Sequence, residues 1–157
     1  MINMQRRVIP VPVDLLGKLL GRLAGPDGPL RLDGPLGVGA IGGHENLRYT
    51  VTAYEPGLRV RLEFLAGSPL EGFHELWVRP LGVDRSEMVH TLVARPRGVM
   101  LLLWPLATRW THQALVADLL DDAERAATGR VRHPARWSPW VRLPHAVTAA
   151  PVTEPAP

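Results

Sequence analysis

The sequence predicts one α+β domain in which a curved antiparallel sheet packs against a long helix near the C-terminus. Two observations predict this fold class. Apolar residues recur three and four positions apart over residues 104–128, as on one face of a helix. Before this segment, apolar and polar residues alternate in several short runs, which is typical of strands with one dry face and one wet face. A lone long helix must bury its apolar face, and the sheet is the available partner.

Length, charge and composition narrow the class of protein. A chain of 157 residues fits a single domain that can bury a core without disulfides, and the absence of cysteine excludes thiolate metal sites. The apolar run at residues 99–104 is far shorter than the roughly 20 residues that a membrane span requires. A net charge of +3, with no basic run interleaved with aromatics, does not indicate nucleic-acid binding. We therefore expect a cytoplasmic protein with no membrane span and no nucleic-acid partner.

The first elements are a strand and a short helix. Residues 4–9 are expected to form a strand, which Pro10 and Pro12 end because proline cannot donate a ladder hydrogen bond. Leucines at helical spacing then predict a helix over residues 13–23. Two glycines inside this helix weaken it by about 1 kcal/mol each relative to alanine.

A glycine-rich segment follows a second short strand, which is expected within residues 30–36. Residues 37–43 read GVGAIGG, and this spacing is not the fingerprint of a dinucleotide-binding loop. The segment leads into a strand pattern, so no helix N-terminus is available to bind a phosphate. We interpret it as a tight turn in which the backbone requires positive φ.

Four further strands are separated by short turns, which predicts an antiparallel meander. The alternation is clearest in the second of them, where apolar residues alternate with Arg59, Arg61 and Glu63. The four strands are expected at residues 47–54, 58–65, 72–79 and 87–95.

The long helix is expected to have Pro105 in its first turn and Gly129 just beyond its end. Its apolar face is predicted to contain His112, Leu115, Val116, Leu119, Leu120, Ala123 and Ala127. The acidic side chains are expected on a solvated face, and they are Asp118, Asp121, Asp122 and Glu124. We place the domain at residues 1–129 and a proline-rich, extended or disordered tail at residues 130–157.

The ordered set of strand and helix motifs resembles a known superfamily. The matching segments are GGHENLRYTVTAYEPGLRVRLEF, GFHELWV, MVHTLVARPRG and LLWPLATRWTHQALVADLLDDAE, within residues 37–127. They are similar to the SRPBCC, or START-like, helix-grip superfamily, which includes polyketide cyclase/dehydrase-like proteins. The resemblance implies about seven antiparallel strands wrapped around a long C-terminal helix, with a ligand cavity between sheet and helix. It implies no particular chemistry, because one fold hosts many functions.

Five side chains are candidates for the lining of that cavity, and they are His74, His90, His112, Tyr49 and Met88. The facing of His74 depends on strand register, because a shift of one residue would turn Glu75 inward instead. The resemblance favours His74. Together these residues predict a site for a small hydrophobic molecule.

The three histidines allow three interpretations. They could shape the pocket through local hydrogen bonds, act as general acid or base, or bind a metal as a three-histidine site. We favour the first, and expect no metal and no other cofactor, because no H-x-x-x-H pair occurs.

Whether the protein is an enzyme stays open. The first alternative to a binding protein is a polyketide cyclase/dehydratase-like enzyme that uses a cavity histidine. The second is an interaction protein that docks through Trp137 and Trp140 of the tail, or through Trp77 on the outer sheet face. A homodimer is compatible with all of these.

Overall fold

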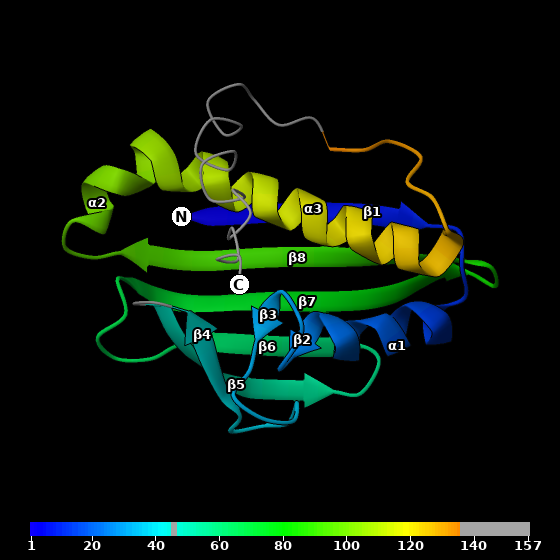
Figure 1. Ribbon diagram of the computed structural model, residues 1–157, viewed down its shortest axis with the longest axis horizontal. Helices are drawn as coiled ribbons and strands as arrows, with labels where there is room; N and C mark the ends of the chain where they lie inside the picture. The colour runs from blue at the N-terminus through cyan, green and yellow to red at the C-terminus, as the bar shows by residue number, and fades with distance from the viewer. Residues whose placement is uncertain (45–46, 136–157) are drawn as a thin grey trace, which may run out of the picture.

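A six-stranded antiparallel sheet holds a long helix against one face in the computed structural model, which describes residues 1–44 and 47–135 (Figure 1). The strand order is β1-β8-β7-β6-β5-β4. The sheet strands are β1 (Ile2–Ile9), β4 (Ile41–His44), β5 (Leu47–Glu55), β6 (Arg59–Phe64), β7 (Leu70–Gly82) and β8 (Arg85–Pro96). The helical elements are α1 (Val13–Leu23), α2 (Met100–Leu103), the π-helical turn η1 (Trp104–Thr108) and α3 (Arg109–Thr128). The predicted fold class is confirmed, whereas Trp137 and Trp140 lie outside the described residues.

The main sheet has six strands, whereas about seven were expected. The second predicted strand, at residues 30–36, is reduced to β3 (Leu30–Arg31), which pairs in parallel with β2 (Ala24–Gly25) outside the main sheet. Beyond it, Leu32 makes one isolated bridge to Gly42 of β4. Gly34 and Pro35 follow directly, and neither residue favours the interior of a strand.

The helical segment begins earlier than predicted and is not uniform. Pro105 lies inside η1 rather than in the first turn of a helix that starts at Trp104. Proline has no N–H group for the i→i−4 bond, and a π-helical turn lets the backbone pass this residue with a different hydrogen-bond spacing. At the other end Gly129 has φ +76°, and it caps α3 in the left-handed conformation as predicted.

The acidic face of α3 was predicted incorrectly at two positions. Asp121 and Glu124 are only 6% and 1% exposed, and both form ion pairs with Arg7 of β1. The Arg7 Nη1 to Glu124 Oε2 distance is 2.7 Å. Conversely, Leu115 was placed on the apolar face but is 48% exposed. The face that α3 buries is therefore rotated toward Asp121 and Glu124, because a cation on the neighbouring strand compensates both carboxylates.

The chain beyond α3 returns to the same ion-pair cluster. The backbone N–H of Ala135 donates to Asp121 Oδ2 at 2.7 Å, and that of Arg132 donates to Glu124 Oε1 at 3.3 Å. The carbonyl oxygen of His133 accepts from Arg7 Nη1 at 3.3 Å. Residues 132–135 are thus attached to β1 and α3 by hydrogen bonds, on the C-terminal side of the predicted domain boundary.

The hydrophobic core lies between the sheet, α1 and α3. Val60, Leu62, Leu76 and Val78 face it from β6 and β7, which agrees with the alternation in the sequence. Leu16 and Leu20 of α1 and Val116, Leu119 and Leu120 of α3 close it from the other side. In Figure 1, α3 runs along β8 and β1, while α1 lies below β7 in the view.

The outer face of the sheet carries charged and aromatic side chains. Glu75 accepts hydrogen bonds from Arg59 Nε at 2.9 Å and from Arg61 Nε at 2.7 Å. The guanidinium groups of the same arginines lie over the rings of Trp77 and Phe73, at 4.8 and 4.0 Å from the ring centroids. None of the helices in the described ranges is long and apolar enough to span a bilayer.

Candidate functional site

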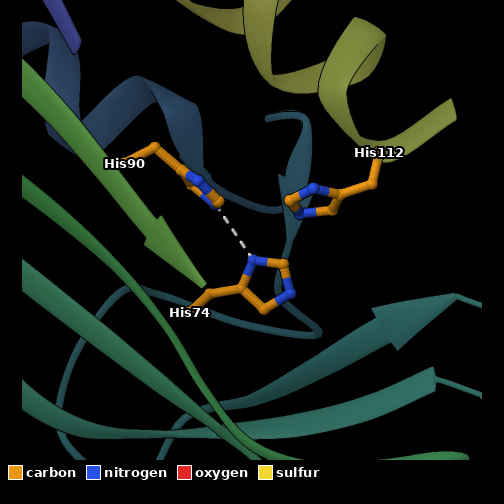
Figure 2. A group of neighbouring side chains, drawn as sticks. All are labelled: His74, His90 and His112. Carbon is orange, nitrogen blue, oxygen red and sulfur yellow. Dashed lines mark hydrogen bonds between the residues drawn. The ribbon is translucent and has the colours of Figure 1, made fainter. Parts of the chain in front are cut away.

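Three histidines from three separate elements converge on the inner face of the sheet (Figure 2). His74 comes from β7, His90 from β8 and His112 from the first turns of α3. Strand register determines which way His74 faces. His74 pairs with Leu62 on β6 and with Leu92 on β8, and it is only 8% exposed. The predicted inward orientation of His74 is therefore what the structure has, and Glu75 lies on the outer face.

The three rings form a nearly equilateral triangle. Their centroids are 5.3 Å apart for His74 and His90, 5.5 Å for His74 and His112, and 5.4 Å for His90 and His112. The Nδ1 atom of His74 lies 3.1 Å from Nε2 of His90, within hydrogen-bond distance. One nitrogen from each ring can be chosen so that all three lie within 4.8 Å of one another. We call these residues the histidine triad.

The hydrogen bond between His74 and His90 leaves other ring nitrogens of the triad without a partner. A neutral imidazole has one N–H donor and one acceptor nitrogen, so the contact between His74 and His90 uses one nitrogen of each ring. Within the described part of the chain, Nδ1 of His90 and both ring nitrogens of His112 are buried without a hydrogen-bond partner. Each buried polar group left unpaired costs about 1–3 kcal/mol, so three of them in one place mark the triad as the candidate functional site.

Burial keeps the triad neutral near pH 7. Desolvation lowers the pKa of His112 to about 4. Desolvation, with a smaller contribution from charge on His112, lowers the pKa of His90 to about 3. The pKa of His74 is also well below its usual range, because the ring is desolvated and lies beside two other titratable imidazoles. All three rings are therefore uncharged at neutral pH, with one N–H group and one lone pair each.

Aromatic and aliphatic side chains surround the triad. The ring of Phe64 meets His74 edge-on, with centroids 5.0 Å apart, and the ring of Trp104 lies 5.8 Å from that of His112. Trp104 also belongs to a small apolar cluster with Leu70, Leu92 and Ala94. Our reading of the sequence missed Phe64 and Trp104 as site residues. A signal was present for both, because Phe64 continues the apolar alternation of β6 and Trp104 lies two helical turns before His112.

The other two predicted cavity residues lie in the main core. Met88 is fully buried two residues before His90 on β8, and Tyr49 is 3% exposed on β5. The Tyr49 hydroxyl donates to the carbonyl oxygen of Arg31 at 2.9 Å, and burial raises its pKa to about 12. Tyr49 thus ties β3 to the sheet, and its hydroxyl already has a partner.

An open groove of about 460 Å³ lies at a different place, between α1 and the turn that joins β5 to β6. Its lining includes Asp14, Lys18, Tyr54 and Leu58, and none of the triad residues. The cavity between sheet and long helix that the resemblance implies is therefore not this groove. The triad is instead the part of the inner face where, among the described residues, buried ring nitrogens lack hydrogen-bond partners.

Comparison with known proteins supports the fold and gives no direct indication of activity. No protein-family profile matches the sequence, and no curated protein matches it either. Solved structures do match. A Thermus thermophilus protein, TTHA0849, superposes with a TM-score of 0.58 at 18% identity, over 82% of this chain and 98% of that chain.

Two further solved structures match this chain, one of a synthase and one of a dimer. Norcoclaurine synthase from Thalictrum flavum, in complex with dopamine and hydroxybenzaldehyde, gives a TM-score of 0.55 at 12% identity, covering 76% of this chain and 83% of that chain. The Aha1 dimer from Colwellia psychrerythraea gives 0.53 at 13% identity, covering 80% and 98%. Identities this low carry information about fold alone. This protein has a helix-grip fold, with a C-terminal helix held against a curved antiparallel sheet.

Proposed function

We propose that the protein binds a small, largely apolar molecule between the sheet and the start of α3, with the histidine triad as its polar contact. The observation that carries this proposal is the set of buried, unpartnered nitrogens on His90 and His112. Phe64 and Trp104 supply apolar surface next to these nitrogens. A mostly apolar lining with a few convergent polar groups is typical of small-molecule sites.

Binding is favoured over acid–base catalysis by the protonation of the triad. A general acid or base works best when its pKa is close to the working pH. The pKa values of about 3 for His90 and about 4 for His112 leave these rings uncharged and weakly basic at neutral pH. They are better suited to accept or donate a hydrogen bond than to abstract a proton. A cyclase- or dehydratase-like enzyme that uses a cavity histidine is the alternative.

A fluorescent apolar anion can test the site without knowledge of the natural ligand. We expect the dye 1-anilinonaphthalene-8-sulfonate to bind metal-free protein saturably, and His112→Leu to weaken this binding about fivefold, since one hydrogen bond is worth about 1 kcal/mol. Fluorescence titration in the presence of EDTA measures the dissociation constant.

Two exposed residues provide controls for the dye experiment. Leu115 lies on the outer side of α3, and Leu106 is 76% exposed in η1. Alanine at either position should leave the dissociation constant unchanged. An unchanged constant in His112→Leu, or weaker binding in Leu106→Ala, would place the dye elsewhere and count against the proposal.

A second proposed function is self-association through the apolar surface of α2 and η1. Large apolar side chains are exposed here in nearly consecutive positions, with Leu102 at 69% and Leu106 at 76%, and a contiguous apolar patch of this kind is typical of an interface. The exposed members are Val99, Leu101, Leu102, Leu103, Leu106 and Trp110. The matched helix-grip structure from C. psychrerythraea is a dimer.

Light scattering coupled to gel filtration tests this association. We expect the wild-type chain to elute as a dimer and the double variant Leu102→Asp/Leu106→Asp as a monomer, because two buried carboxylates would lack partners in the interface. Val83→Asp, at an 88% exposed residue in the turn between β7 and β8, is the control and should remain dimeric. A monomeric wild-type protein at concentrations of about 100 μM would exclude a dimer of micromolar affinity.

A further inference from the structure

The histidine triad has the composition and spacing of a metal site, although no short-spaced ligand pair in the sequence indicated one. We propose that His74, His90 and His112 together bind one divalent transition-metal ion, with Zn²⁺ the best-suited ion and a fourth coordination position left open. This inference goes beyond the binding of an apolar molecule and does not depend on the identity of that molecule. Three imidazole ligands with one free position is an arrangement that zinc uses in catalytic sites.

Distances within the triad are close to those that a tetrahedral ion needs. Zn–N bonds of about 2.0–2.1 Å place two ligand nitrogens about 3.3 Å apart. Nδ1 of His74 and Nε2 of His90 are 3.1 Å apart, so this pair already has the required separation. The three chosen nitrogens lie within 4.8 Å of one another, so His112 would have to approach by at most about 1.5 Å.

The unpaired nitrogens supply the second argument. Both ring nitrogens of His112 are buried without a hydrogen-bond partner in the described structure. In Figure 2 both nitrogens of His112 are on the side of its ring that is turned toward His74 and His90. An ion in the middle would coordinate Nδ1 of His74, Nε2 of His90 and one nitrogen of His112. It would replace the hydrogen bond between His74 and His90 and give one of the two unpaired nitrogens of His112 a partner.

The surroundings define the kind of ion and the character of the open position. Among the described residues, the triad is the only group of three or more histidine, cysteine, aspartate or glutamate side chains with this spacing, and it contains no carboxylate. Imidazole nitrogens without carboxylates favour Zn²⁺, Cu²⁺, Co²⁺ or Ni²⁺ over Mg²⁺ and Ca²⁺, which prefer oxygen ligands. Three neutral ligands leave both positive charges of the ion uncompensated, so the open position is expected to take an oxygen-donor or anionic group.

Metal titration of tag-free, EDTA-treated protein tests the proposal, with Co²⁺ as a spectroscopic probe. We expect one equivalent of Co²⁺ per chain, the visible absorption bands of a tetrahedral complex, and loss of these bands when Zn²⁺ is added. His112→Ala should weaken binding by at least about 100-fold, since even substitutions outside the first coordination sphere cost 10–100-fold. His133→Ala is the matched control, because His133 is an exposed histidine in the segment after α3 and is not a member of the triad.

A measurement on the unaltered chain guards against a variant that fails to fold. In imidazole nitrogen NMR spectra, Zn²⁺ should shift the signals of His74, His90 and His112 and leave that of His133 in place. Absence of saturable binding by folded wild-type protein would overturn the proposal. Equal affinity in a folded His112→Ala variant would also overturn it, because the ion would then be held elsewhere. Since no organic ligand is added, failure here leaves the dye-binding result unaffected.

Discussion

Replacement of Arg7 by methionine is expected to lower the free energy of unfolding by about 3–5 kcal/mol, because removal of one partner from a buried ion-pair cluster leaves uncompensated charge. The side chain of Arg7 is 19% exposed, and those of Asp121 and Glu124 are 8% and 2% exposed. Within residues 1–44 and 47–135, the two carboxylates would keep only the backbone N–H groups of Ala135 and Arg132 as hydrogen-bond donors. Urea denaturation followed by circular dichroism measures the change.

The neighbouring residue provides a matched control for this prediction. The side chain of Arg6 on the same strand is 71% exposed, and its Nε atom lies 4.0 Å from Glu87 Oε1. Glu87 is buried, but it keeps its closer partner Arg79 at 2.6 Å when Arg6 is removed, so Arg6→Met should change stability by only about 0–1 kcal/mol. Similar losses in the Arg6 and Arg7 variants would contradict the assignment of the Arg7 cluster as the buried connection between β1 and α3.

Alanine substitutions at two glycines of α1, Gly17 and Gly21, are expected to change the free energy of unfolding with opposite signs. A Cβ atom on Gly17 would lie 2.4 Å from the carbonyl oxygen of Gly57, which is backbone in the β5–β6 turn. The helix and the turn would have to separate, and overpacking of this kind costs about 1–3 kcal/mol. A Cβ atom on Gly21 meets nothing within 4 Å, so Gly21→Ala should stabilise the protein by about 1 kcal/mol through helix propensity.

The comparison is sensitive because both variants introduce the same methyl group into α1. The difference in unfolding free energy between Gly17→Ala and Gly21→Ala is expected to be about 2–4 kcal/mol. Thermal and urea denaturation of the two variants beside the wild type would measure it. If Gly17→Ala were stabilising as well, α1 would not approach the β5–β6 turn as closely in solution as the structure has it.

Local patterns in the sequence predicted most of the secondary structure. The helix over residues 13–23 has the predicted bounds, because leucine spacing and the flanking Pro12 are local signals. The alternation at residues 58–65 correctly predicted that Val60 and Leu62 face the core, because successive side chains on a strand point to opposite faces. The start of the long helix was predicted less well, since Pro105 is compatible both with a first turn and with the π-helical turn that the structure has.

Burial of charge could not be predicted from the same patterns. Asp121 and Glu124 look like members of a solvated helix face when only the helix is considered. Their partner Arg7 is 114 and 117 residues away in the chain, and only the pairing of β1 with β8 brings it alongside α3. A carboxylate is buried when a cation lies opposite it, and helical periodicity has no information on what lies opposite.

The sequence by itself determined that a curved antiparallel sheet carries one long helix, and that three histidines occupy positions able to face inward. Only the tertiary structure decided that His74, His90 and His112 meet with ring centroids within 5.5 Å of one another, and that Tyr49 and Met88 belong to the core. Periodicity specifies which face of an element is buried. The position of each residue relative to its neighbours on the adjacent elements depends on strand register and on how the helix packs on the sheet. Both are set by contacts between segments that are distant in the sequence.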